Sequence, residues 1–240
     1  MLAFVFLLEI PFRSAYASPG VHTVTAYGNA QIDTAQSKFG GASGLFDGTG
    51  DYLSIPDSDD WSLGTGDFTI DFWVRFKALP GGGSGATFYS QYVDGNNRHF
   101  LALYNSAGSY YLSWYITSGG SNLLAKNEAW TPSTGVWYHV AAIRNGGNFM
   151  LFVAGTQLGS PTSASIALPD LAANLDVGRY FAGTWELNGW LDEFQISKGI
   201  ARWTSNFSPP TSAHVADSST VLLLHMDGAD GSTTFTDDSY

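Results

Sequence analysis

Short runs of alternating hydrophobic and polar residues fill the chain from Val21 onward, with turns between them. The clearest run covers residues 67–77, with the sequence DFTIDFWVRFK. Its apolar side chains share one face: Phe68, Ile70, Phe72, Val74 and Phe76. The polar residues and Trp73 take the other face, as in a strand whose side chains point alternately into and out of a core. Helical periodicity is almost absent, so the pattern predicts an all-β chain.

Further strands are predicted wherever similar runs recur, at residues 86–92, 100–104, 110–117, 136–143, 149–154, 175–177 and 190–196. The sequence RNGGN at 144–148 separates two of them and indicates a hairpin, because Asn and Gly adopt positive φ at little cost. Many short strands with turns between them favour an antiparallel β-sandwich of two packed sheets with little helix.

Composition fits one large β domain. The chain has 240 residues, of which 15% are aromatic and only 13% charged, so there is ample apolar surface to bury. Aromatic residues also favour strands. Intrinsic disorder, which goes with low hydrophobicity and high charge, is excluded for most of the chain.

The chain is acidic, with a formal net charge of −11. A negative surface repels phosphate backbones, so nucleic acid is not an expected partner. The same carboxylates suit hard cations such as calcium. Cysteine is absent, which excludes a disulfide framework and thiolate chemistry.

The first 20 residues form an apolar segment that needs separate treatment. Residues 1–12 read MLAFVFLLEIPF, and Ala-Tyr-Ala at 15–17 fits a signal-peptidase site. The positively charged n-region of a signal peptide is missing, however, and Glu9 and Pro11 interrupt the apolar run. A secretory signal, a retained strand at residues 4–8 and a gene-fragment artefact are the three alternatives. The segment is too short and too broken to span a bilayer, and no other segment is a candidate span.

The C-terminus resembles a second beginning of the domain. Residues 221–231, VLLLHMDGADG, form an apolar strand that runs into an Asp/Gly cluster, and the chain stops at Tyr240. A lone strand is not stable in water, so this one fills a slot in its own domain, fills one in a neighbour or opens a following repeat. Pro209-Pro210 ends strand pairing, so residues 208–217 read as a domain exit. The predicted units are 1–20, a domain at 21–210, and a linker with an extra strand at 211–240.

Five sequence blocks in order resemble the laminin-G-like, concanavalin A-like lectin/glucanase superfamily. They are FGGASGLFDGTGDYL at 39–53, FTIDFWV at 68–74, VWYHVA at 136–141, GWLDEFQI at 189–196 and ARWTSNFSPP at 201–210. The resemblance implies a jelly-roll sandwich whose concave face or loop rim often binds glycans. It also implies an opening strand LLLHFDG, which here stands at the tail, at residues 222–228. Similar domains occur in bacterial surface proteins and phage structural proteins, so an extracellular, cell-surface or virion location is expected.

Catalysis is not expected. Glucanases of the superfamily carry Glu-x-Asp-x-x-Glu or a close variant on one strand, which sets two carboxylates on one face across the scissile bond. This chain has adjacent acids instead, Asp192 and Glu193, which in a regular strand project to opposite faces. The five histidines show no metal-ligand spacing along the sequence: His22, His99, His139, His214 and His225.

Calcium is the one cofactor that the sequence suggests. The resemblance implies that acids of the opening strand can approach the strand carrying Asp192 around a calcium ion. The candidate ligands are Asp47, Asp192, Asp227, Asp230 and Asp237. In the alternative reading, the Asp-Gly pairs only form turns.

Glycan binding uses aromatic faces that stack on sugar C–H surfaces, with a few polar groups for the hydroxyls. One candidate surface is Trp73 with Asp71 and Arg75, and a second is Tyr111 with Tyr115. Two further tryptophans lie near predicted loops, Trp130 and Trp185. Each of these aromatic rings could equally be buried under a loop, since Trp is mostly buried in proteins.

The sequence therefore predicts a non-catalytic carbohydrate-binding module of a larger protein, with glycans or a cell-surface polysaccharide as partner. One alternative is an assembly module that donates its C-terminal strand to adjacent repeats or like subunits. A glycoside hydrolase is the other alternative, and the missing carboxylate pair opposes it.

Overall fold

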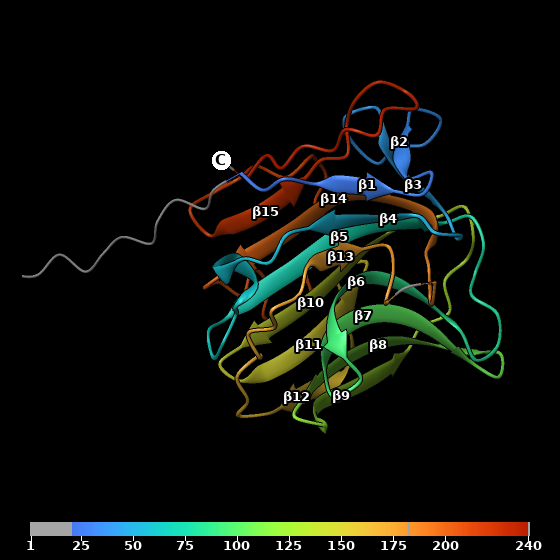
Figure 1. Ribbon diagram of the computed structural model, residues 1–240. Helices are drawn as coiled ribbons and strands as arrows, with labels where there is room; N and C mark the ends of the chain where they lie inside the picture. The colour runs from blue at the N-terminus through green and yellow to red at the C-terminus, as the bar shows by residue number, and fades with distance from the viewer. Residues whose placement is uncertain (1–20, 182, 240) are drawn as a thin grey trace, which may run out of the picture.

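A computed structural model describes residues 21–181 and 183–239 of the chain, so the predicted signal peptide or strand in residues 1–17 lies outside the described residues. Two antiparallel sheets face each other across one core (Figure 1). The first has seven strands in the order β1 (Thr25–Tyr27), β4 (Tyr52–Ile55), β13 (Leu175–Val177), β6 (Gly85–Asp94), β7 (Asn97–Ser106), β8 (Ser109–Ser118) and β9 (Ser121–Ala129).

The second sheet has eight strands. Seven follow the order β12 (Thr156–Ser163), β11 (Asn148–Val153), β10 (Trp137–Asn145), β5 (Phe68–Phe76), β14 (Asn188–Lys198), β3 (Ser43–Asp47) and β2 (Gln31–Asp33). The eighth, β15 (Thr220–Leu224), pairs with β14. A short 3-10 helix, η1 (Asp59–Trp61), precedes β5. The predicted all-β sandwich is confirmed.

The core lies between the sheets, and β5 shows how alternation builds it. All five apolar side chains predicted for its inner face are buried at 1% exposure or less. Phe72 of this strand stacks on Phe194 of β14 at 5.6 Å between ring centroids. The predicted hairpin joins β10 to β11, with Asn145 opposite Asn148 and both glycines between them at positive φ. Period-two patterning therefore identified the strand faces, and the Asn and Gly residues identified this turn.

The outer face of the eight-stranded sheet is covered by residues 201–217. That face carries apolar side chains of β10 and β11, among them Phe152, which need a cover. Trp203 and Phe207 supply it, stacked on each other at 4.1 Å, and Arg202 pairs with Asp217 at 3.0 Å. This segment therefore crosses the sheet instead of leaving the domain, which corrects the predicted exit at 208–217.

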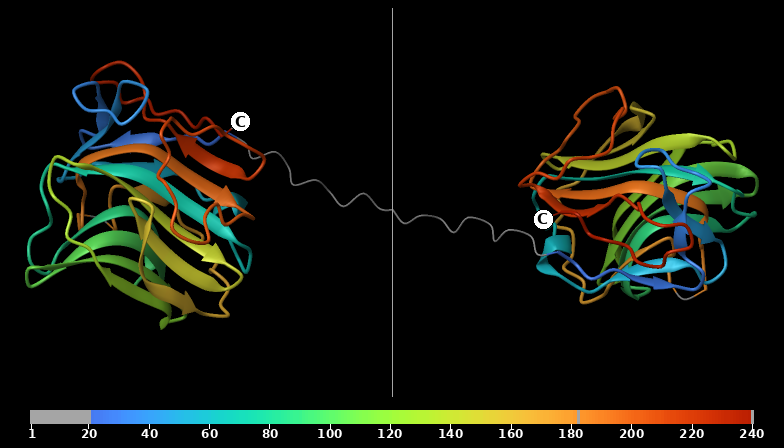
Figure 2. Two further views of the ribbon diagram at one scale, coloured as in Figure 1. Left: turned by 180° about the vertical axis from the view of Figure 1, so that it is seen from behind. Right: turned by 90° about the horizontal axis from the view of Figure 1, so that it is seen from above.

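The tail completes the same sheet. Strand β15 runs antiparallel to β14, with Leu224 opposite Phe194 and Leu222 opposite Ile196. Strand β3 pairs with the first half of β14 and β15 with the second half, so the two share one side of that strand. Seen from behind, the red β15 lies beside the orange β14 (Figure 2). The strand thus occupies a slot in its own domain, the first of the three alternatives.

Residues after β15 tie both ends of the described chain together. Asp237 accepts hydrogen bonds from the backbone N–H of His22 at 2.8 Å and of Leu223 at 3.1 Å. The N–H of Ile32 donates to the carbonyl of Ser232 at 2.8 Å. Because these partners lie far apart in sequence, the tail is an integral part of the sandwich.

Candidate functional site

A cavity of about 360 Å³ opens on the outer face of the seven-stranded sheet. It is lined by Arg98, Phe100, Tyr104, Ser113, Tyr115, Tyr180 and Trp185. Five of these seven residues are aromatic, so the lining combines apolar ring faces with a guanidinium and several hydroxyl groups.

Two paired strands build the floor of the cavity. Phe100 of β7 lies opposite Tyr115 of β8, and their rings stack at 5.4 Å with 14° between planes. Alternation sends Leu101 and Leu103 of β7 into the core, which leaves Phe100 and Tyr104 on the outer face. The floor is therefore set by the register of a regular ladder.

The β13–β14 connection forms the wall. The Ser90 hydroxyl lies 2.8 Å from the Tyr180 carbonyl, and the Thr87 N–H donates to the Trp185 carbonyl at 2.9 Å. Trp185 has a φ of 50°, and a side chain at Gly85 would begin 2.7 Å from its ring. Only glycine at position 85 leaves room for the indole, which stacks on Tyr104 at 5.2 Å.

Two polar groups of the cavity, those of Tyr180 and Arg98, are available to donate hydrogen bonds to a ligand. Burial raises the pKa of Tyr180 to about 12, so its hydroxyl keeps its proton at neutral pH and can donate a hydrogen bond. The Nε atom of Arg98 is buried and has no hydrogen-bond partner within the described part of the chain. Flat rings beside such donors give the combination that recognises a sugar ring with hydroxyl groups.

Two of the predicted aromatic residues meet in this cavity, Tyr115 and Trp185. Tyr111 lies on the same strand as Tyr115 but outside the lining, opposite Tyr104. Trp130 is 9% exposed and packs edge-on against Tyr138 in the core. Sequence reasoning missed Arg98, Phe100, Tyr104 and Tyr180 as members of the site. The alternation in β7 was a signal for the first three.

The other predicted binding surface, Trp73 with Asp71 and Arg75, lies on the covered face of the eight-stranded sheet. Trp73 is 5% exposed, with the Lys38 ammonium 4.0 Å from the centre of its ring. Arg75 donates to the carbonyl of Gly135, and Asp71 is fully buried. Because chain segments cover this face, the three residues do not form an open surface for a sugar.

Asp71 is an ionised carboxylate inside the protein. Burial would raise its pKa, but the contacts of its Oδ2 atom with His139 and His214 outweigh burial and hold the pKa at about 2. These two histidines are far apart in sequence, so the absence of a metal-ligand spacing said nothing about their proximity in space.

Strand β14 carries a β-bulge at its two adjacent acids. Its register against β5 shifts between Asp192 and Gln195, and Glu193 has a φ of 54°. Leu191 and Phe194 on either side both point into the core. Asp192 and Glu193 therefore share the outer face, so the prediction that they project to opposite faces is wrong. An extra residue in a strand interrupts the alternation on which that prediction depended.

Asp192 lies in a small buried acidic site. Its Oδ2 atom accepts hydrogen bonds from the backbone N–H of Lys38 at 2.6 Å and of Phe39 at 3.2 Å. Its Oδ1 atom is buried and unpartnered among residues 21–181 and 183–239. Burial, together with the charges of Glu193 and Asp227, raises the pKa of Asp192 to about 7.

Asp227 reaches the same turn from the tail. Gly40 of that turn has a φ of 62°, and a side chain there would collide with the Asp227 carboxylate. The glycine thus lets Asp227 approach the backbone next to Phe39, whose N–H binds Asp192. The structure thus places Asp227 close enough to Asp192 for its charge to act on that carboxyl, although the two acids are separated along the chain.

The remaining acids predicted as metal ligands bind backbone N–H groups elsewhere. The Oδ1 atom of Asp47 accepts from Thr49 at 2.8 Å, and that of Asp230 accepts from Thr34 at 3.1 Å. Asp237 holds His22 and Leu223 as described above. Only the Asp47 contact is a local turn, as in the turn-forming alternative, whereas Asp230 and Asp237 link segments that are far apart in sequence.

Two packed antiparallel sheets, with an aromatic cavity on the outer face of one, define a lectin-type jelly-roll sandwich. The chain belongs to the concanavalin A-like lectin/glucanases superfamily, whose family model matches residues 47–202. No curated protein matches the chain.

Solved structures share this fold at low sequence identity. Domain 4 of AbnA, a GH43 extracellular arabinanase from Geobacillus stearothermophilus in complex with arabinotriose, is 20% identical with a TM-score of 0.56, over 75% of this chain and 83% of that chain. A putative carbohydrate binding protein from Bacteroides ovatus is 15% identical with a TM-score of 0.58, over 92% of this chain and 57% of that chain. The enzymatically active domain of tailspike protein 2 from bacteriophage CBA120 is 11% identical with a TM-score of 0.58, over 92% of this chain and 35% of that chain.

Within the described residues, no helix has the length and hydropathy needed to cross a membrane.

Proposed function

We propose that this chain is a non-catalytic carbohydrate-binding domain, and that a glycan segment binds in the cavity between β7, β8 and the β13–β14 connection. The observation that carries the proposal is the set of rings around that cavity, with Trp185 and Tyr104 stacked on each other and Tyr115 beside them. A volume near the lower end of the range for ligand pockets suits a short segment of a polysaccharide.

The comparisons support the same assignment. One structural neighbour was solved with arabinotriose, and another is described as a putative carbohydrate binding protein. An extracellular arabinanase domain and a phage tailspike among the neighbours support an extracellular, cell-surface or virion location. The expected partner is a cell-surface or other polysaccharide.

The composition of the cavity supports binding without hydrolysis. Glycosidases set two carboxyl groups about 5–10 Å apart around the scissile bond. The residues that line this cavity include no Asp or Glu. Asp192 and Glu193 lie on the other sheet and are fully buried, where a glycosidic bond has no access to them.

Replacing Trp185 by Ala should weaken glycan binding by roughly 30-fold, because central tryptophans of binding sites are often worth about 2 kcal/mol. A glycan array that includes arabinans identifies the ligand, and titration calorimetry then measures the affinity. Trp190→Ala is the matched control, since Trp190 is half-buried on the opposite sheet and should leave affinity unchanged. The proposal fails if a broad panel shows no binding, or if the two variants bind equally well.

We further propose that Asp192 and Asp227 contribute to a calcium site. The buried and unpartnered Oδ1 atom of Asp192 supports this, as do the nearby charges of Glu193 and Asp227, which add to the effect of burial in raising its pKa. Calcium takes six to eight oxygen ligands, and backbone carbonyls and water would supply those that the two carboxylates do not. A bound cation would neutralise a carboxylate that burial otherwise disfavours.

Millimolar calcium chloride should raise the melting temperature by roughly 5–10 °C, since saturation at about 100 times the dissociation constant adds about 2.7 kcal/mol. Asp227→Asn should abolish this shift, because it removes one of the two charges. Asp230→Asn, another exposed acid of the tail, should keep the shift. A melting curve that calcium does not move, or an equal loss in both variants, would contradict the site.

A further inference from the structure

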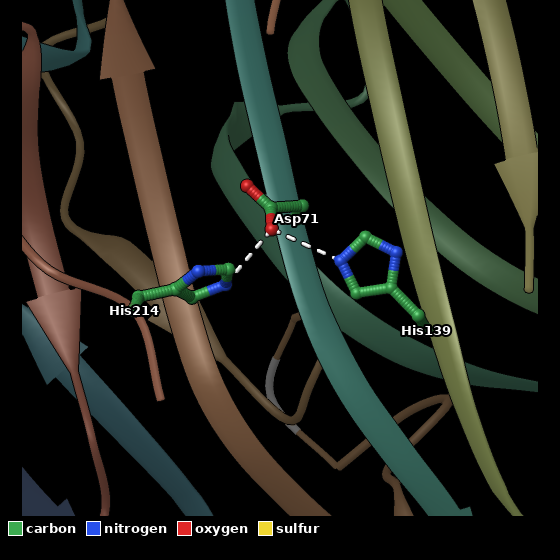
Figure 3. A group of neighbouring side chains, drawn as sticks. All are labelled: Asp71, His139 and His214. Carbon is green, nitrogen blue, oxygen red and sulfur yellow. Dashed lines mark hydrogen bonds and ion pairs between the residues drawn. The ribbon is translucent and has the colours of Figure 1, made fainter. Parts of the chain in front are cut away.

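A second group of metal-ligating atoms lies on the opposite sheet from the aromatic cavity. Asp71 of β5, His139 of β10 and His214 of the covering segment converge there (Figure 3). The Asp71 Oδ2 atom lies 3.1 Å from His139 Nε2 and 2.9 Å from His214 Nε2. All three ligand atoms lie within 4.8 Å of one another. Both imidazole rings point toward the same carboxylate oxygen (Figure 3).

Strand register places the first two residues. In the β10–β5 ladder, Ala141 lies opposite Asp71 and His139 opposite Trp73, so Asp71 and His139 are diagonal neighbours on the outer face. The His139 ring is enclosed by Trp73, Trp203 and Phe207, at centroid distances of 5.3, 5.4 and 5.7 Å. This aromatic cage fixes the direction of its Nε2 atom.

The third residue, His214, is positioned by the covering segment, residues 201–217. The N–H of His214 donates to Glu193 Oε2 at 2.7 Å, a contact made possible by the bulge that turns Glu193 outward. His214 also approaches Asp71 closely, and its side chain is only 10% exposed. The position of His214 is therefore fixed from its own backbone, independently of its contact with Asp71.

Several buried polar atoms of Asp71, His139 and His214 have no hydrogen-bond partner among the described residues. The Oδ1 atom of Asp71 and the Nδ1 atom of His139 are buried without a partner there. His214 Nε2 is also unsatisfied, because its approach to Asp71 at 2.9 Å lacks the angle of a hydrogen bond. Of the three, His214 Nε2 is one of the converging atoms, and because buried polar atoms are almost always paired, its lack of a partner indicates a missing ligand.

We propose that Asp71, His139 and His214 bind a divalent transition metal, with zinc as the best match. Two imidazole nitrogens and one carboxylate oxygen are zinc ligands, whereas calcium prefers oxygen alone. Zinc bonds of about 2.1 Å at the tetrahedral angle separate ligand atoms by about 3.4 Å, a few tenths of an ångström more than the distances from Asp71 Oδ2 to the two histidines. Water completes the fourth position.

Metal entry needs only a proton rearrangement. Each imidazole coordinates through an Nε2 lone pair, so the Nε2 proton of a neutral ring moves to Nδ1 through solvent, and a protonated ring releases one proton to solvent. Asp71 coordinates as the carboxylate. The metal would then join the covering segment to β5 and β10 and hold residues 201–217 on the sheet.

The test is zinc titration of chelator-stripped full-length chain, followed by calorimetry and elemental analysis. We expect one zinc per chain. His214→Gln should weaken affinity by about 100-fold or more, since loss of an outer-shell partner alone costs 10–100-fold. The matched control is His22→Gln, because His22 pairs with Asp60 at 3.0 Å and its side chain is similarly covered at 13% exposure. That variant should bind zinc like the original chain.

Cobalt(II) gives a second readout on the unsubstituted chain, so the result does not depend on whether His214→Gln folds. Intense visible absorption from a four-coordinate ion is expected, and zinc should displace it. No zinc binding below millimolar concentration, a weak six-coordinate cobalt spectrum, or equal affinities of His214→Gln and the original chain would each overturn the proposal. In those cases Asp71 and its histidines form a structural ion pair only.

Discussion

Deleting residues 220–240 is expected to unfold the domain. Leu222 and Leu224 of β15 are fully buried, and loss of each such side chain costs about 2–5 kcal/mol. Removal would also leave the second half of β14 without a partner on one side and expose Phe194 and Ile196. Because whole domains are stable by only about 5–15 kcal/mol, this loss is comparable to the total. Circular dichroism and urea titration of the truncated chain measure it.

Point substitutions separate this effect from simple shortening. Leu224→Ala should lower the free energy of unfolding by about 3 kcal/mol. Val215→Ala is the control, since that side chain is 83% exposed and should change stability by less than about 0.5 kcal/mol.

The same truncation also tests the assembly alternative. If the strand fills its own sheet, the full chain should run as a monomer in size-exclusion chromatography with light scattering. A truncated chain that stays folded with an unchanged unfolding midpoint would contradict the role of β15. Oligomers of the full chain that disappear on truncation would show strand exchange between copies instead.

Local patterns predicted the elements of this fold well. The alternation in residues 67–77 identified both faces of β5, and Asn-Gly-Gly-Asn identified the β10–β11 turn. The apolar tail was correctly predicted to be a strand, and the family resemblance indicated which strand it replaces. Each of these signals lies within about ten residues, which is the range over which backbone geometry dictates side-chain direction.

Features that depend on distant contacts were not predictable. Glu193 at positive φ has no sequence signature, since glutamate rarely adopts that conformation, yet the bulge there turns two acids to one face. Tyr180 enters the cavity because a connection folds back over β6 and β7. His139 and His214 meet only because residues 201–217 cross the sheet. In each case tertiary packing decides the position of the side chain.

His99, which is 2% exposed on β7, should make a contribution to stability that is lost in mild acid. Gln91 donates its Nε2 hydrogen to the Ala173 carbonyl at 2.8 Å, so its Oε1 atom accepts from His99 Nε2 at 2.8 Å. The Nδ1 atom of His99 is then the free base, and it faces no acceptor among the described residues. Burial accordingly lowers the pKa of His99 to about 4.

The direction of this pH dependence follows from proton uptake by His99 when the chain unfolds. An unfolded histidine titrates near pH 6.5, so between pH 6.5 and 4 the unfolded chain binds a proton that folded His99 does not. The contribution of His99 to the free energy of unfolding is complete above pH 6.5 and declines by about 2 kcal/mol at pH 5 and about 3 kcal/mol at pH 4. Urea titrations at a series of pH values measure this slope.

Other groups also titrate in this range, so the comparison with a variant isolates His99. His99→Gln keeps a donor for Gln91 and removes the titrating ring. At pH 7 it should lose about 1–2 kcal/mol through imperfect packing and hydrogen bonding. Its stability should nevertheless depend less on pH, so that the variant and the original chain converge near pH 5 and cross below it. Parallel curves across the whole range would show that His99 is not the source of the acid sensitivity, because a group absent from the variant cannot produce a slope common to both.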